Sequence, residues 1–209
     1  MTEYPKIQTV FKRNPDTGFK TLIEGDYSLP EFEYLKGNDW IWSEKVNGTN
    51  IRILWDGTKV NFGGKTNNSQ IPTPLTTYLM NKFFPADMQR VFADTPVCLY
   101  GEGYGAKIQS GGNYRPDQSF VLFDVLINGW WLERTNIEGI AQGLDIDIVP
   151  IIGVGTLTEM VEMTRAGFKS QWGDFTAEGI VARPKVELFS RNNERIITKI
   201  KHKDFKVQK

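Results

Sequence analysis

The segment from Ile51 to Phe62 constrains the fold most, because its pattern predicts two antiparallel strands joined by a tight turn. Alternating residues stand on either side of Asp56-Gly57, and this dipeptide between two such runs is typical of a β-hairpin. Further short apolar runs predict strands that are mostly buried. These runs lie around Trp40 and Trp42 and at Val97–Tyr100, Phe120–Leu126, Gly179–Ala182 and Ile196–Ile200.

Helical patterns are fewer than strand patterns. Between Pro74 and Phe84, the apolar side chains recur at the spacing of one helical face. Thr135 and Thr156 each begin a possible capping box, and Gly167 is a plausible stop for the second helix. Strands that dominate over helices indicate an α+β fold with antiparallel sheets flanked by helices. Without repeats or an obvious linker, the 209 residues predict a single domain over 1–209.

The composition excludes several classes of protein. Cys98 is the one cysteine, so no intramolecular disulfide can form. No stretch approaches the ~20 apolar residues of a membrane span, and we expect a cytoplasmic monomer without membrane contact. The 25 basic residues balance the 25 acidic residues, so net charge gives no sign of nucleic acid. From Arg191 to Lys209, however, seven Lys/Arg face only two acids. This stretch is either a solvated tail or a stripe that contacts phosphates.

Lys45 stands in the run Ser-Glu-Lys-Val-Asn-Gly-Thr-Asn from Ser43 to Asn50. Taken alone, Asn47-Gly48 is a common turn signature, which would make Lys45 an exposed strand lysine. Four other segments favour a functional interpretation of the lysine.

These four segments each place a charged or aromatic residue at the end of a strand or along one face of it. Glu102 lies among glycines after a strand, and Phe123-Asp124 ends another strand. Glu178 precedes an apolar strand, while Lys199 and Lys201 share one strand face because side chains alternate with period two. Each segment alone also fits an ordinary turn glycine, a strand-end acid or a surface lysine pair.

In this order, the segments resemble the motifs of the covalent nucleotidyltransferase superfamily of ATP-dependent ligases and capping enzymes, over Lys45 to Lys201. The resemblance implies an ATP-grasp-like adenylation domain in which Lys45 attacks ATP and carries AMP. It implies that Phe123 stacks on the purine and that Glu102 holds the ribose hydroxyls and helps to bind metal. Glu178 would bind Mg²⁺ or Mn²⁺. The remaining implied contacts are Lys199 and Lys201 with the α-phosphate and Glu44 with the adenine amine, directly or by its backbone.

The chemistry needs these residue types. A free lysine is only about 0.1% neutral at pH 7.5, a deficit of roughly 4 kcal/mol for an amine that must attack phosphorus. Nearby positive charge reduces this deficit. The two lysines and a divalent cation would also stabilise the negative charge that develops on the phosphates.

Two residues indicate the branch of the superfamily. Asn47 stands where DNA ligases usually have Asp, and Asn50 stands where DNA ligases and capping enzymes usually have Arg. These residues, and the run Tyr100–Gly105, resemble the nick-sealing RNA ligases of phages and RNA-editing systems. The resemblance implies that Asn50 positions the 3′ end and that Lys65 contacts AMP or the 5′ phosphate, with Arg52 as a substitute.

We therefore expect an ATP-dependent RNA ligase that adenylates Lys45, passes AMP to a 5′-phosphate and joins that end to a 3′-hydroxyl. RNA ends or nicks would be its partners, in the cytoplasm of a cell or of a phage host. A minimal DNA ligase, a GTP-using capping enzyme and a non-catalytic nucleotide- or RNA-binding module remain alternatives. The chain continues for only eight residues after Lys201, so we expect no OB-fold domain here.

Overall fold

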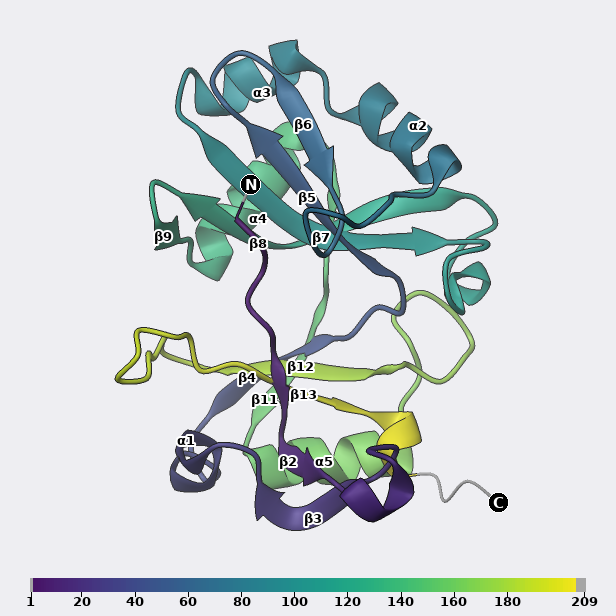
Figure 1. Cartoon of the computed structure of the whole chain (residues 1–209), viewed down its shortest axis with the longest axis vertical. Helices are drawn as coiled ribbons and strands as arrows, with labels where there is room; N and C mark the ends of the chain where they lie inside the picture. The colour runs from purple at the N-terminus through teal and green to yellow at the C-terminus, as the bar shows by residue number, and fades with distance from the viewer. Residues whose placement is uncertain (1, 206–209) are drawn as a thin grey trace. The chain divides into compact units, whose positions relative to one another are not determined.

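The computed structural model describes residues 2–205, which divide into two compact units. The first unit combines residues 2–5 with Asn47–Val149, and the second combines Lys6–Val46 with residues 150–205. The chain therefore passes from one unit to the other three times, after Pro5, Val46 and Val149. Figure 1 shows how the elements follow one another along the chain.

The first unit is built on a six-stranded sheet with the order β10-β8-β7-β5-β6, and β9 pairs with β8. All neighbours are antiparallel except β10 and β8. The strands are β5 (Thr49–Trp55), β6 (Val60–Gly63), β7 (Val97–Gly105), β8 (Gln118–Ile127), β9 (Trp130–Trp131) and β10 (Asp147–Ile148).

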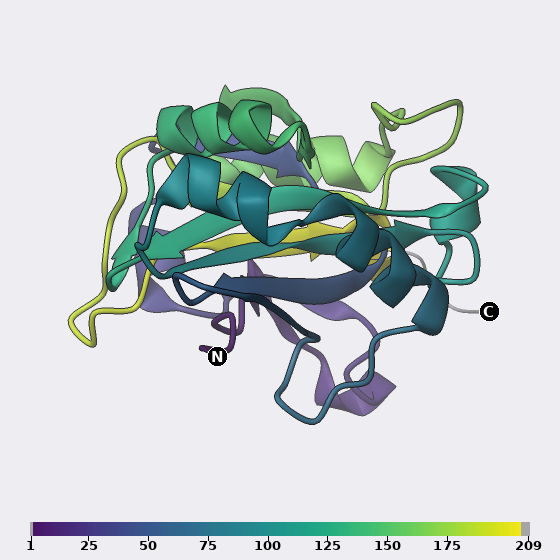
Figure 2. The same ribbon diagram turned by 90° about the horizontal axis from the view of Figure 1, so that it is seen from above.

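Helices α2 (Thr73–Lys82), α3 (Pro85–Phe92) and α4 (Arg134–Leu144) accompany this sheet (Figures 1 and 2). Their apolar side chains are buried against one face of it. A short 3₁₀ helix, η2 (Gly111–Asn113), follows β7. The helices contribute Leu75, Leu79, Met88 and Ile137 to a core with residues of β5, β7 and β8. The opposite face carries the polar residues Asn50, Arg52 and Glu102, because side chains alternate along a strand.

The second unit contains a five-stranded sheet with the order β1-β13-β12-β4-β11. Only the pair of β1 and β13 is parallel. The strands are β1 (Gln8–Thr9), β4 (Trp40–Glu44), β11 (Ile151–Gly155), β12 (Gly179–Pro184) and β13 (Thr198–Lys201). A separate hairpin-like pair, β2 (Phe11–Arg13) and β3 (Leu22–Tyr27), stands beside η1 (Pro15–Thr17).

One face of the second sheet is covered by α1 (Pro30–Tyr34) and α5 (Leu157–Ala166), which share a core with Trp40, Ile180 and Ile200. A 3₁₀ helix, η3 (His202–Phe205), follows β13. The capping box at the start of α5 is confirmed, since Thr156 Oγ1 accepts the Glu159 N–H and the Glu159 carboxylate accepts the Thr156 N–H. Gly167 is the C-cap, as the sequence predicts.

The α+β class, with largely antiparallel sheets flanked by helices, is confirmed, and so is the hairpin through Asp56-Gly57. Asn47-Gly48 does not close a hairpin, because β4 and β5 lie in different sheets. The capping box at Thr135 is wrong: α4 begins at Arg134 with Glu133 as N-cap and no side-chain cap. Whether the two units act as one catalytic domain over 1–209 stays a prediction.

Gly101 in β7 has no room for a side chain. A Cβ added there would collide with the Phe120 ring and the Val121 carbonyl oxygen. We expect Gly101→Ala to lower the free energy of unfolding in urea by about 1–3 kcal/mol, because the buried neighbours must shift. Gly139→Ala, at an exposed position of α4, is the matched control, since a Cβ there meets nothing within 4 Å. It should stabilise by about 0.5–1 kcal/mol, and an equal loss in both variants would contradict the steric account.

Candidate functional site

Lys45 follows directly after β4 and continues its pairing with the central strand of the second sheet. Its backbone N–H donates to the Gly179 carbonyl at 2.9 Å, and Gly179 in turn pairs with Lys201 on β13. Lys45 and Lys201 therefore stand at the same level of the sheet, one on each side of Gly179. Register between three strands brings together residues that are far apart in the sequence.

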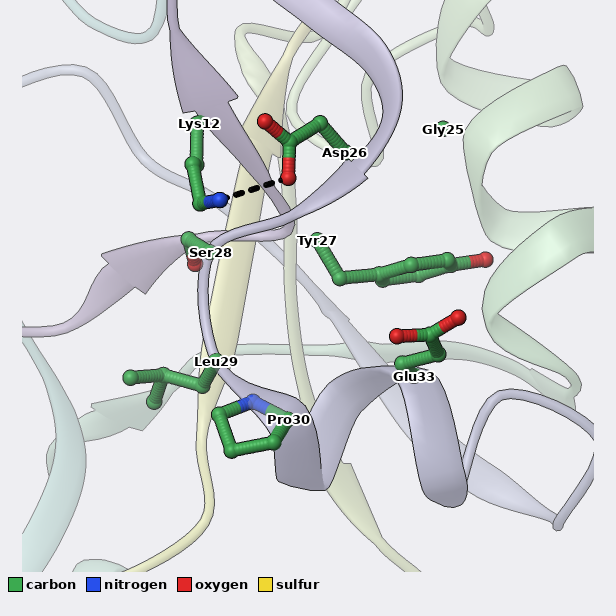
Figure 3. Close-up of a pocket in the computed structure, with 8 residues that line it drawn as sticks. All are labelled: Lys12, Gly25, Asp26, Tyr27, Ser28, Leu29, Pro30 and Glu33. Carbon is green, nitrogen blue, oxygen red and sulfur yellow. Dashed lines mark ion pairs between the residues drawn. The ribbon is translucent and has the colours of Figure 1, made fainter.

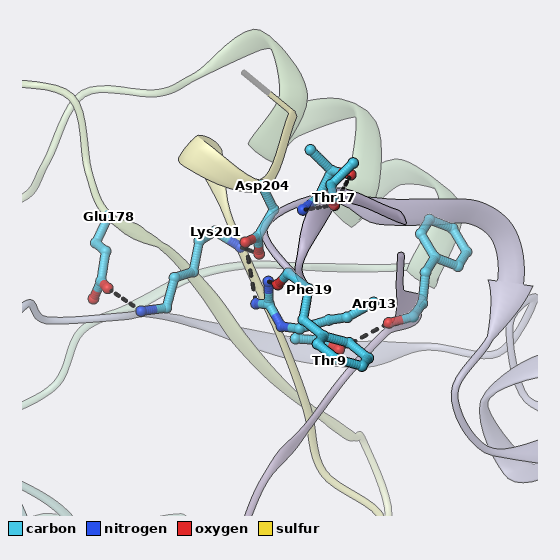
Figure 4. A network of polar contacts seen from close by, with 9 residues as sticks. Thr9, Arg13, Thr17, Phe19, Glu178, Lys201 and Asp204 are labelled. Carbon is cyan, nitrogen blue, oxygen red and sulfur yellow. Dashed lines mark hydrogen bonds and ion pairs between the residues drawn. The ribbon is translucent and has the colours of Figure 1, made fainter. Parts of the chain in front are cut away.

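The Glu178 carboxylate joins these two lysines. Its Oε2 lies 2.7 Å from Lys45 Nζ, and its Oε1 lies 2.7 Å from Lys201 Nζ (Figure 4 shows the Lys201 contact). The side chains of Lys45, Lys201 and Glu178 are 19%, 21% and 9% exposed, so the cluster is shielded but reachable from solvent. The predicted association of these three residues is thus present in the structure.

Gly179 is required by the close packing between the two lysines. A Cβ at this position would collide with the Ile200 carbonyl oxygen and lie 2.7 Å from the Lys201 Cα. The glycine of the Glu178-Gly179 pair therefore allows β12 and β13 to approach at the point where Glu178 meets the lysines.

Lys199 lies on the same face of β13 as Lys201, opposite Val181 on β12. Thr198 and Ile200 are fully buried, whereas the two lysines are partly exposed, which is the alternation expected of a strand. The predicted lysine pair therefore shares one face.

A buried carboxylate supports the backbone of Lys201. Asp204 is 3% exposed; its Oδ2 accepts the Lys201 N–H at 3.0 Å and its Oδ1 accepts from the Arg13 guanidinium at 3.1 Å (Figure 4). Arg13 also donates to the Phe19 carbonyl at 3.2 Å, so it links η3 to the chain before β3. Such a charge-assisted network fixes the end of β13.

Glu44 points to the other face of the sheet from Lys45 and is 1% exposed. Its Oε1 accepts from Ser170 Oγ at 2.6 Å, and its Oε2 accepts the Gln171 N–H at 2.8 Å. Both carboxylate oxygens thus hold the loop that leads to Glu178. A contact of Glu44 with the adenine amine stays a prediction.

In the first unit, Asn50 on β5 and Glu102 on β7 are directly opposite each other. Gly48 precedes them where the chain approaches β7 closely: a Cβ there would collide with the Gly103 carbonyl oxygen and lie 2.8 Å from Glu102 Cγ. Steric crowding therefore explains the glycine of the Lys-Val-Asn-Gly run. The Asn47 N–H donates to the Tyr114 hydroxyl at 3.1 Å.

Phe123 lies at an irregularity of β8. Gly101 pairs with Leu122 and Tyr100 pairs with Asp124, so Phe123 is left over as a bulge. Bulges re-aim side chains, and here Phe123 and Asp124 both contact Tyr4, on the sheet face opposite the helices. The Phe123 ring is half-buried.

Lys65 is exposed in the loop after β6, and buried Arg52 holds this loop. Arg52 Nε donates to the Gly64 carbonyl at 2.7 Å, and its Nη1 donates to Asn67 Oδ1 at 3.1 Å. At 1% exposure, Arg52 orders the Lys65 loop instead of presenting its guanidinium to solvent.

Comparison with known proteins identifies the family. The family model for RNA ligase matches residues 38–201, which contain Lys45, Glu102, Glu178, Lys199 and Lys201. The chain belongs to the RNA ligase family.

Solved RNA ligases of Naegleria gruberi share the fold of this RNA ligase family member. A variant with ATP and Mn superposes with a TM-score of 0.68 at 15% identity, covering 96% of this chain and 56% of that one. A variant without ligand superposes with a TM-score of 0.67 at 16% identity, covering 98% of this chain and 58% of that one. The chain therefore spans less than two thirds of the length of these proteins.

A second surface feature of this RNA ligase family member is a hollow in the second unit. This hollow of about 570 Å³ beside β3 and α1 is lined by residues that include the ion pair of Lys12 and Asp26 at 2.7 Å (Figure 3).

No helix within residues 2–205 is long and apolar enough to cross a membrane. Of the basic stretch from Arg191, Lys206 and Lys209 lie outside the described residues.

Sequence analysis missed several residues that support the site. Asp204, Arg13 and Ser170 act through contacts with residues far away in the chain, as does Tyr4. The one weak signal is that Asp204 is an acid beside the basic run that ends β13.

Glu44 makes the stability of the RNA ligase fold depend on pH. Burial raises the pKa of its carboxyl, while the bonds from Gln171 and Ser170 act in the opposite direction. Because the pKa of Glu44 is raised in the folded state, its protonated carboxyl adds to the free energy of unfolding. This stabilisation is fully present below about pH 4.5 and is lost as pH rises through the raised pKa. The free energy of unfolding of wild type should therefore fall relative to Glu44→Gln as pH rises from 4 to 8, measured with urea.

Ser170→Ala provides the matched comparison. Its hydroxyl stabilises the charged carboxylate, so this variant should lose more stability relative to wild type at pH 8 than at pH 4. A difference between wild type and Glu44→Gln that does not change with pH would contradict the account.

Proposed function

We propose that this chain is an ATP-dependent RNA ligase whose Lys45 forms a lysyl-AMP intermediate. The observation that carries the proposal is the Glu178 carboxylate between Lys45 and Lys201, on the helix-free face of the sheet, in a member of the RNA ligase family. The arrangement supplies an amine nucleophile, a second cation and an acid within one cluster.

Lys45 must leave its ion pair with Glu178 and lose a proton to solvent before its neutral amine can attack the α-phosphorus of ATP. The P–N bond to Lys45 then forms as the bond to the β-phosphate breaks, and pyrophosphate leaves. For a free lysine, loss of the proton costs roughly 4 kcal/mol at pH 7.5. Once Glu178 turns away, positive charge from Lys201 and Lys199 reduces the free energy needed to deprotonate the attacking amine. The same charge stabilises the negative charge that develops on the phosphates as AMP is transferred. We propose that Glu178 changes partners when ATP binds.

The residues fit a divalent cation that arrives with ATP. Within residues 2–205, no group of three or more His, Cys, Asp or Glu side chains could hold a metal alone. Mg²⁺ is commonly held by one or two carboxylates together with substrate phosphates and water, which suits Glu178, with help from Glu102. When bound, the cation would neutralise charge on the phosphates. Variants of the Naegleria gruberi ligase are solved with ATP and Mn.

We also propose nucleotide contacts for three residues of the first unit. Phe123 offers a half-exposed ring for stacking on adenine, a contact worth about 1–3 kcal/mol. Glu102 would accept from the ribose hydroxyls, and exposed Lys65 would contact AMP or the 5′ phosphate. We propose one adenylation domain over 1–209, acting as a cytoplasmic monomer.

In the later steps, AMP passes to a 5′-phosphate end, and a 3′-hydroxyl attacks and releases AMP. Asn50 Oδ1 is buried and accepts no hydrogen bond from residues 2–205. A buried acceptor without a donor is costly, so a hydroxyl proton of the substrate would satisfy it. This supports the role of Asn50 at the 3′ end.

Incubation with α-labelled ATP and Mg²⁺ tests the first step. After a denaturing gel, we expect a labelled band at the mass of the chain that is absent in Lys45→Ala. Lys201→Ala and Glu178→Ala should each reduce the rate of adduct formation at least about tenfold, because each removes charge support worth ~1.4 kcal/mol or more.

Lys203→Ala is the control for Lys201→Ala, because Lys203 is exposed on η3 two residues further along the chain. It should keep nearly the wild-type rate. Labelling of Lys45→Ala, or a near-normal rate in Lys201→Ala or Glu178→Ala, would reject the role assigned to that residue. A GMP adduct with labelled GTP would favour a capping enzyme.

Sealing of nicks that differ only in the sugar tests the substrate. We expect faster joining when the strand that supplies the 3′-hydroxyl is RNA than when it is DNA, and the measure is the sealing rate with pre-adenylated 5′ ends. Asn50→Ala should slow this step more than it slows adduct formation. Preference for a DNA 3′-hydroxyl strand would instead assign a minimal DNA ligase.

A further inference from the structure

Residues 2–5 lie on the helix-free face of the first unit's sheet, although the chain that follows them belongs to the second unit. Three hydrogen bonds attach them to separate elements. Tyr100 Oη on β7 donates to the Thr2 carbonyl at 3.1 Å. The Asn67 N–H donates to Glu3 Oε1 at 3.0 Å, and Tyr4 Oη donates to Asp124 Oδ2 at 2.8 Å.

Tyr4 is the centre of an aromatic cluster on this face. Its ring centroid lies 5.1 Å from Phe123 at an interplanar angle of 73°, 5.1 Å from Tyr100 and 5.5 Å from Trp131. Edge-to-face pairs at these distances are attractive beyond the area that they bury. Tyr4 thus connects the ring of Phe123 to two rings that belong to β7 and β9.

Phe123 depends on such a neighbour because it occupies the bulge of β8, where regular cross-strand pairing does not set its direction. The near-perpendicular contact with Tyr4 leaves at least one face of the Phe123 ring uncovered by Tyr4. A planar base can stack on that face while Tyr4 holds the ring from the side or from behind.

The Tyr4 hydroxyl fixes Tyr4 itself. Its acceptor, Asp124, is 0% exposed and follows Phe123 directly in the sequence. The aromatic contact and the hydrogen bond therefore attach Tyr4 to two adjacent residues at the bulge. The ring contact sets where the Phe123 ring lies, and the hydrogen bond adds to the stability of the segment.

We infer that Tyr4 is a positioning residue for the base of ATP: the segment of residues 2–5 orders the Phe123 ring on which adenine stacks. The inference rests on the proposed function. Tyr4 touches no reacting atom in this scheme, so its loss should weaken nucleotide binding and leave the chemical step at Lys45 largely intact.

The rate of lysyl-AMP formation against ATP concentration tests the inference in the full chain. Tyr4→Ala should raise KM for ATP about tenfold and change kcat less than threefold. Tyr4→Leu fills part of the volume without an aromatic ring and should behave in the same way. Tyr4→Phe keeps the ring and should hold KM within about twofold of wild type, although loss of its bond to Asp124 lowers Tm.

Phe62→Leu is the stability-matched control, because Phe62 packs against the helix-covered face and meets neither Tyr4 nor Phe123 in the ring contacts. It should lower Tm without raising KM. Tyr4→Ala and Tyr4→Leu with wild-type KM, or with a loss confined to kcat, would overturn the inference while the proposed function stands. Failure of wild type to form any adduct would overturn the proposed function, and this inference with it.

Discussion

The ammonium groups of Lys45 and Lys201 repel each other across the central strand β12, and the Glu178 carboxylate offsets that repulsion by accepting a contact from each, at 2.7 Å. The geometry exists because β12 runs between β4 and β13, so that Gly179 meets Lys45 on one side and Lys201 on the other. Gly179 itself has no room for a side chain. The candidate chemistry of the second unit depends on this register, since a shift by one residue would turn Lys201 to the opposite face.

Both units use their sheets in the same way. Helices α2, α3 and α4 cover one face of the first sheet, and α1 and α5 cover one face of the second. The polar residues of the proposed nucleotide contacts lie on the other face of each sheet. In this arrangement the apolar cores account for the stability of each unit, and the helix-free faces remain available for polar chemistry. Glu44 is the exception, because it lies on the core side and orders the loop before Glu178.

Contacts from residues outside the motifs support the helix-free face of each sheet. Asp204 holds the backbone of Lys201, Arg52 holds the loop that carries Lys65, and Tyr4 holds Phe123. None of these supporting residues belongs to the short motifs by which the family resemblance is visible. A substitution of a supporting residue can therefore alter nucleotide handling while every motif residue remains intact.

The sequence by itself determined the strand-rich α+β class, the hairpin through Asp56-Gly57 and the shared face of Lys199 and Lys201. These follow from local turn chemistry and from the period-two alternation of strands, which any short segment contains. Only the tertiary structure decided which residues meet. Tyr4 and Asp124 are 120 positions apart, and Glu44 and Ser170 are 126 apart, so their contacts depend on non-local packing. Periodicity assigns a side chain to a face, but strand order and register choose its partner.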